Sequence, residues 1–151
     1  MPVYGKEEHD REMAEKAAAT PAADLARFSL PERFSPEDRE GFAKGVTAFR
    51  AGDYYLAHDL WEEVWHSYPL ADRRFLQGLI HVAVGAYHLQ CENRKGCRSQ
   101  FRKATDKLSP FAPKHWGIDV ELLLQGIRQT DPGADGELQP HSRLTHLQKV
   151  I

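Results

Sequence analysis

The stretch that decides the fold is Arg73–Gln90, RRFLQGLIHVAVGAYHLQ. It contains no proline and is apolar almost all the way round a helix. Such a helix belongs in the middle of a bundle, because no face of it prefers water. Three polar residues interrupt it, and at 100° per residue Gln77, His81 and His88 share one stripe. Since a buried polar group needs a partner, this stripe is the first candidate for a functional site.

Four further helices are predicted around the central one. Ser35 and Asp53 are N-cap residues for two of them, and Gly52 and Pro69 provide their ends. The other two helices are predicted at residues 94–108 and 118–129. Because short loops favour antiparallel neighbours, we expect an all-α fold, a compact antiparallel bundle of about five main helices with an N-terminal arm.

The chain has 151 residues, enough for one globular core. Residues 1–34 combine a charged, alanine-rich segment with a proline-containing stretch, and we expect an arm and an extended segment there. Residues 35–130 hold the helical pattern and form the predicted bundle domain. Residues 131–151 begin with turn-forming residues and are predicted to be a turn-rich C-terminal tail.

Composition limits the classes of partner. The 20 basic and 22 acidic residues give a formal net charge of -2, so we expect no nucleic-acid or membrane partner. The N-terminus lacks the apolar core of a secretory signal, and the central apolar run is interrupted before it could cross a bilayer. We therefore predict a cytoplasmic protein in which Cys91 and Cys97 stay reduced.

A candidate site follows if the helix after Asp53 packs antiparallel against the central helix. His58 and Glu62 then face the polar stripe. Imidazole and carboxylate together suit a divalent metal such as zinc, nickel, copper or iron, and they equally suit acid–base chemistry of a hydrolase-like kind. The predicted catalytic or metal-binding set is His58, Glu62 and His88, and the predicted ligand-binding set is Gln77, His81, Trp65, Tyr54 and Tyr87.

A non-catalytic interpretation uses the same residues. His58 and Glu62 have the spacing of an ordinary helical i,i+4 pair, and the zinc-protease pattern HEXXH is absent. Gly78 and Gly85 put two small residues on one helix face, where a second helix can approach closely, so a homodimer is expected. The alternative to a small-molecule site is thus an oligomerising or adaptor module whose polar cluster fixes helix register.

Four stretches taken together resemble a known family. They are FRAGDYYLAHDLWEEVW at 49–65, FLQGLIHVAVGAYHLQ at 75–90, ENRKGC at 92–97 and KATDKL at 103–108. This order is similar to the small all-helical family catalogued as domain of unknown function 309. The matching positions are Gly52, Asp53, Tyr54, His58, Glu62, Trp65, Gln77, Gly78, Tyr87, His88, Asn93 and Gly96.

Three positions depart from that family pattern. Asp59 stands where glutamate is usual, His81 where glutamine is usual, and Cys97 where alanine is usual. The change at 81 adds a side chain that titrates near neutrality. The resemblance implies a helical fold, while the activity of the family is itself unassigned.

Overall fold

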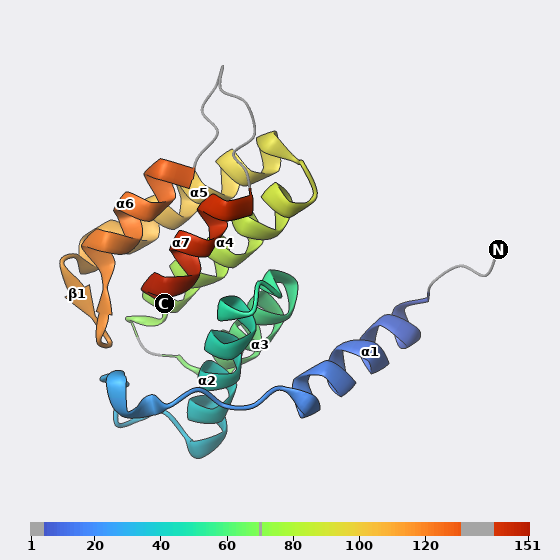
Figure 1. Cartoon of the computed structure of the whole chain (residues 1–151). Helices are drawn as coiled ribbons and strands as arrows, with labels where there is room; N and C mark the ends of the chain where they lie inside the picture. The colour runs from blue at the N-terminus through green and yellow to red at the C-terminus, as the bar shows by residue number, and fades with distance from the viewer. Residues whose placement is uncertain (1–4, 70, 131–140) are drawn as a thin grey trace.

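The structure, a computed structural model, describes residues 5–69, 71–130 and 141–151 (Figure 1). These residues form seven α-helices, two short 3-10 turns (Leu25–Arg27 and Ser109–Phe111) and a two-stranded hairpin, so the all-α prediction is confirmed. The helices are α1 (Lys6–Ala19), α2 (Pro36–Arg50), α3 (Tyr54–Ser67), α4 (Arg73–Gln90), α5 (Arg94–Leu108), α6 (Val120–Thr130) and α7 (His141–Val150).

Side-chain caps fix where three of the helices begin. The Ser35 hydroxyl accepts a hydrogen bond from the Asp38 amide at 3.0 Å, and the Asp53 carboxylate accepts one from the Leu56 amide at 3.3 Å. The Asn93 side chain does the same for α5. Each cap satisfies a backbone N–H that has no partner within its helix.

Helix α4 lies between α3 and α5, which pack against it on either side. Its two glycines allow α5 to come close: a Cβ at Gly78 would lie 2.7 Å from Leu108 Cδ2, and one at Gly85 would lie 2.5 Å from Phe101 Cδ1. We had expected these glycines to serve contact between two copies. The structure corrects this, because α5 of the same chain fills the space beside them.

An aromatic cluster joins α2 to α3. The Trp61 ring stacks with Phe42 and Phe49, at centroid distances of 6.2 and 5.7 Å. Its indole N–H donates to the Phe42 carbonyl oxygen at 3.1 Å, which satisfies the only polar atom of this fully buried side chain. Gly45 leaves the room for the Trp61 ring, which a Cβ at that position would overlap.

A small hairpin closes one end of the bundle, where the sequence had indicated only a loop. Strands β1 (Lys114–His115) and β2 (Ile118–Asp119) pair antiparallel. Trp116 in the turn has φ 52°, a left-handed conformation that its buried indole holds in place by donating to Asp72 Oδ2 at 3.0 Å. The Tyr68 hydroxyl donates to the other Asp72 oxygen at 2.9 Å, and burial together with this carboxylate raises the pKa of Tyr68 to about 12.

The two ends of the chain differ in how firmly they pack. Helix α1 lies to one side of the bundle (Figure 1), and Met13 is its one buried residue. Helix α7 packs on α6 and α2 and buries Leu144 and Leu147. The first ten residues of the predicted turn-rich tail, 131–140, lie outside the described residues. No helix in the described part of the chain is long and apolar enough to cross a membrane.

Candidate functional site

One row of α4 is not covered by the bundle. Gln77, His81, Val84 and His88 are half-buried, whereas the residues between them are mostly buried. The prediction that α4 is enclosed on every side is therefore wrong in one respect. The polar stripe lies at the open side of the helix, where α3 and α5 flank it without covering it.

Five side chains from α3 and α4 line a cavity of about 140 Å³ on this open side. They are Tyr55 and His58 from α3, and Val84, Tyr87 and His88 from α4; we call this cavity the ring pocket. The Tyr55 ring lies 5.3 Å from the Tyr87 ring and 5.2 Å from the His58 ring, measured between centroids. The predicted antiparallel packing of the two helices thus brings His58 and His88 to one cavity.

Two oxygen atoms hold the His58 ring. Its Nδ1 lies 3.1 Å from the Tyr55 carbonyl oxygen, and its Nε2 lies 2.9 Å from Glu62 Oε2. Because both oxygens only accept hydrogen bonds, the two contacts are satisfied together only when both ring nitrogens carry protons. Both nitrogens of the His58 ring thus face oxygen atoms of its own helix, α3.

A chain of hydrogen bonds orients His88. The Gly96 amide donates to Asn93 Oδ1 at 2.9 Å, which leaves the amide NH₂ of Asn93 facing His88 Nδ1 at 3.3 Å. An NH₂ group donates, so His88 Nδ1 accepts and the ring proton of the neutral histidine lies on Nε2. The N-cap of α5 therefore sets the tautomer of a pocket residue. Sequence analysis identified the turn but missed this role of Asn93.

Gly96 makes that chain possible. A Cβ there would lie 2.7 Å from Asn93 Nδ2 and 2.9 Å from His88 Cγ, closer than such atoms approach. The separated motif elements Tyr87-His88 and Asn93-x-x-Gly96 thus meet in space as one unit. Their spacing in the sequence was the available signal, but periodicity alone does not show that a cap reaches back to the preceding helix.

His81 belongs to a different contact. Its Nδ1 lies 2.7 Å from Gln100 Oε1 of α5, and among the described residues its buried Nε2 has no hydrogen-bond partner. Burial lowers the pKa of His81, and Lys107 and Lys103 lower it further, while the bond to Gln100 opposes them. His81 therefore faces α5, and the structure does not bring it together with His58. Gln77 is half-buried one turn before it.

Tyr54 and Trp65 lie outside the ring pocket. Tyr54 is buried in the core, its hydroxyl accepts a hydrogen bond from Gln148 at 2.7 Å, and burial raises its pKa. Trp65 lies under the Arg73 guanidinium, 3.8 Å from ring centroid to carbon. Of the predicted ligand-binding residues, only Tyr87 lines this cavity.

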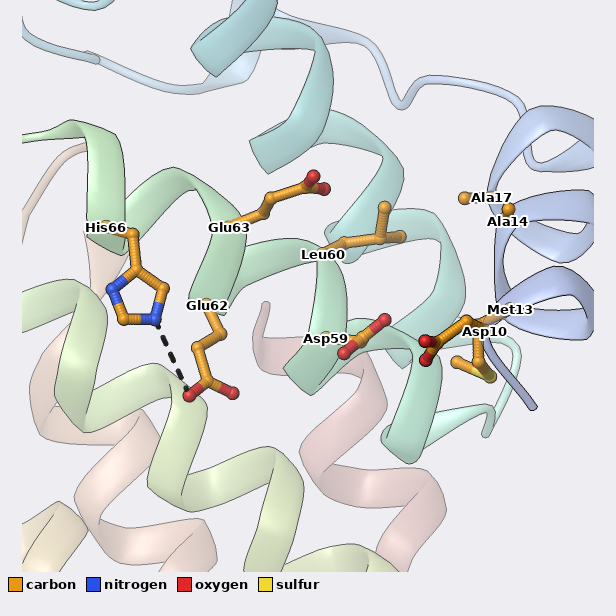
Figure 2. Close-up of a pocket in the computed structure, with 9 residues that line it drawn as sticks. All are labelled: Asp10, Met13, Ala14, Ala17, Asp59, Leu60, Glu62, Glu63 and His66. Carbon is orange, nitrogen blue, oxygen red and sulfur yellow. Dashed lines mark ion pairs between the residues drawn. The ribbon is translucent and has the colours of Figure 1, made fainter. Parts of the chain in front are cut away.

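Figure 2 shows a wider groove between α1 and α3, with a volume of about 390 Å³. Its lining residues are Asp10, Met13, Ala14, Ala17, Asp59, Leu60, Glu62, Glu63 and His66. Glu62 Oε1 lies 3.9 Å from His66 Nε2, so one carboxylate faces a histidine of this groove and also His58. The sequence did not predict the groove, because its second wall depends on where the arm packs.

The predicted metal site gains no support from the arrangement of the described side chains. Among the residues that the structure describes, no group of three or more histidine, cysteine, aspartate and glutamate side chains is placed to hold a metal ion. Cys91 is exposed and Cys97 is buried, both as thiols.

The fold and the ring pocket define a small all-α bundle protein with an aromatic cavity between two antiparallel helices. Residues 42–100 match the model of a family described as a domain of unknown function (DUF309), which confirms the predicted resemblance. The matched region runs from α2 into α5 and contains every residue of the ring pocket. Comparison with curated proteins finds no match.

Proposed function

We propose that the protein binds a small, mostly apolar ligand in the ring pocket, and that His88 donates a hydrogen bond to an acceptor atom of that ligand. The observation that carries this proposal is the convergence of four rings from two helices on one cavity of about 140 Å³. Convergent polar groups in an otherwise apolar cavity are the usual sign of a ligand site.

Volume and chemistry define the class of ligand. A cavity of about 150 Å³ in an unrelated protein takes up benzene, so the ring pocket suits a single six-membered ring or a group of similar size. Tyrosine and histidine rings offer edge and face contacts to such a group. His88 offers the Nε2 hydrogen, because Asn93 occupies its Nδ1.

Binding is favoured over proton transfer by the contacts of His58. A general base needs a ring nitrogen that can accept a proton, and both nitrogens of His58 face oxygen atoms. Glu62 thus holds the wall of the pocket in place. The catalytic and metal-binding roles predicted for His58, Glu62 and His88 give way in this proposal to binding and positioning.

The test uses phenol and toluene as probes, which have the same ring and differ in one hydroxyl group. Histidine-ring NMR signals of the wild-type protein are followed during titration. We expect phenol to shift the signals of His58 and His88, and toluene to bind more weakly because it cannot accept a hydrogen bond from His88.

Val84→Phe is the blocking variant, because the larger side chain fills the cavity from α4. Leu122→Phe is its matched control, since Leu122 is exposed on α6. Binding that is lost in the first variant and kept in the second supports the proposal. Unchanged histidine signals in the wild type, or unchanged binding in Val84→Phe, would overturn it.

A further inference from the structure

We propose that the open side of α3, α4 and α5 is the surface through which two copies of this chain pair, about a two-fold axis that runs parallel to α4. We call this surface the three-helix face. It consists of His58, Glu62 and Trp65 from α3, Gln77, His81, Val84 and His88 from α4, and Gly96, Gln100, Lys103 and Lys107 from α5. The inference does not depend on the proposed ligand.

Contacts within the chain show that the three rows lie side by side. His58 shares the ring pocket with Val84 and His88, which places the α3 row beside the α4 row. Gln100 bonds to His81 at 2.7 Å, which places the α5 row on the other side. All the members named from α3 and α4 are half-buried, as expected for side chains that a partner can cover.

The two edges of the face carry opposite charge. On the α3 edge Glu62 carries a carboxylate whose side chain is 44% exposed, and the acids Asp59 and Glu63 lie beyond it, in the groove against α1. On the α5 edge Lys103 and Lys107 lie near enough to His81 to lower its pKa. Between the edges, the α4 row is formally uncharged when its histidines are neutral. The face is therefore acidic on one side, basic on the other and neutral along the middle.

A two-fold axis along α4 makes this charge pattern complementary to itself. Rotation by 180° about an axis along α4 places the α3 edge of one copy over the α5 edge of the other, and the reverse, while α4 faces α4. A two-fold axis across α4 would instead place acid on acid. An interface between identical copies requires a surface that complements itself in this way, and only the first axis provides it.

The acidic and basic groups of the two edges also lie at the same position along the α4 axis. Trp65 lies against Arg73 near the start of α4, and His58 lies near Val84 and His88, so Glu62 falls between these levels, near Gln77 and His81. On the other side, Gly78 lies beside Lys107, which puts the lysines at the same level. Since rotation about an axis parallel to α4 preserves height, Glu62 of one copy meets the lysine pair of the other.

The size of the face fits a weak, concentration-dependent dimer. The 18 residues of α4 give a length of about 27 Å, and three helices at spacings of 8–10 Å span roughly 20 Å across. This footprint is about 540 Å², less than the roughly 800 Å² per partner that a standard interface buries, and falls in the range of weak, reversible complexes. The ring pocket opens on this face, so pairing would also cover it.

The experiment measures molar mass by light scattering during gel filtration of the full chain at high micromolar concentration. The wild type is expected at twice the chain mass of 17.2 kDa, with dissociation as salt is raised, because exposed charge pairs are screened. Lys103→Glu is expected to weaken dimerisation at least tenfold. Lys103→Glu combined with Glu62→Lys restores opposite charges across the interface and is expected to recover the dimer.

Arg102→Glu is the matched control, since Arg102 lies on the side of α5 that faces α6. It makes the same charge change on the same helix away from the three-helix face, and is expected to leave the dimer intact. A monomeric wild type would overturn the proposal. So would a folded Lys103→Glu variant that dimerises as the wild type does, or a double variant that is no better than either single one.

Discussion

For the replacement of Gly96 with alanine, helix propensity and the geometry of the site predict opposite changes in stability. Alanine is favoured over glycine inside a helix by at most about 1 kcal/mol, so propensity alone predicts a more stable protein. The structure predicts the opposite, because a Cβ at this position would lie 2.9 Å from His88 Cγ and 2.7 Å from Asn93 Nδ2.

The magnitude follows from what must move. Displacing Asn93 removes the N-cap of α5, which costs about 1 kcal/mol, and inserting a methyl group into a close contact costs about 1–3 kcal/mol. After subtracting the propensity gain, we expect Gly96→Ala to lose roughly 2 kcal/mol of unfolding free energy. For a chain of this size the corresponding fall in Tm is roughly 4–8 °C.

Thermal and urea unfolding measure the loss, and Ser99→Ala is the control. Ser99 is exposed in the same helix, so its replacement should stabilise the protein by a few tenths of a kcal/mol through propensity alone. Ring ¹⁵N signals of His88 should also change in Gly96→Ala, since Asn93 no longer holds one tautomer. A Gly96→Ala variant that is more stable than the wild type, with unchanged His88 signals, would refute the reasoning.

Three further outcomes are expected. Gly45→Ala should destabilise the protein by about 3 kcal/mol or more in urea unfolding, because its Cβ would displace the buried Trp61 ring. Burial lowers the pKa of His81 below 6.5 in the folded protein, so the unfolded chain binds the proton first and stability falls as the pH drops through 6.5; His81→Gln should reduce that loss. Asp72→Asn should lower the pKa of Tyr68 from about 12, as read by ultraviolet titration, because the neighbouring negative charge is removed.

Helix ends were predictable because their signals are local. Ser35 and Asp53 cap α2 and α3 as expected, and Gly52 follows α2 with φ 82°, a left-handed conformation that glycine adopts freely. The predicted bounds of α4 and α5 also agree with the structure. Trp116 is the counterexample, since its left-handed turn is held by Asp72, 44 residues away, and no nearby residue signals it.

Periodicity placed His81 and His88 on one stripe correctly, but it could not say which neighbour each would contact. The two rings lie on the same side of α4, yet His81 bonds to α5 and His88 lines a cavity with α3. The outcome depends on how two flanking helices pack around one row. The same limit explains Tyr54, whose motif position indicated a site and whose hydroxyl is instead held in the core by Gln148.

The two cavities beside α3 differ in whether the family match covers all of their residues. The ring pocket is built entirely from residues between 42 and 100, whereas one wall of the groove in Figure 2 comes from α1, outside that range. A function that belongs to the matched domain needs a site that the domain alone can build. The ring pocket meets this condition, since the Tyr55 carbonyl and Glu62 hold His58, and Asn93 with Gly96 holds His88. Because both histidines are fixed from within the matched domain, a ligand of the proposed kind would spend little binding energy on ordering the cavity.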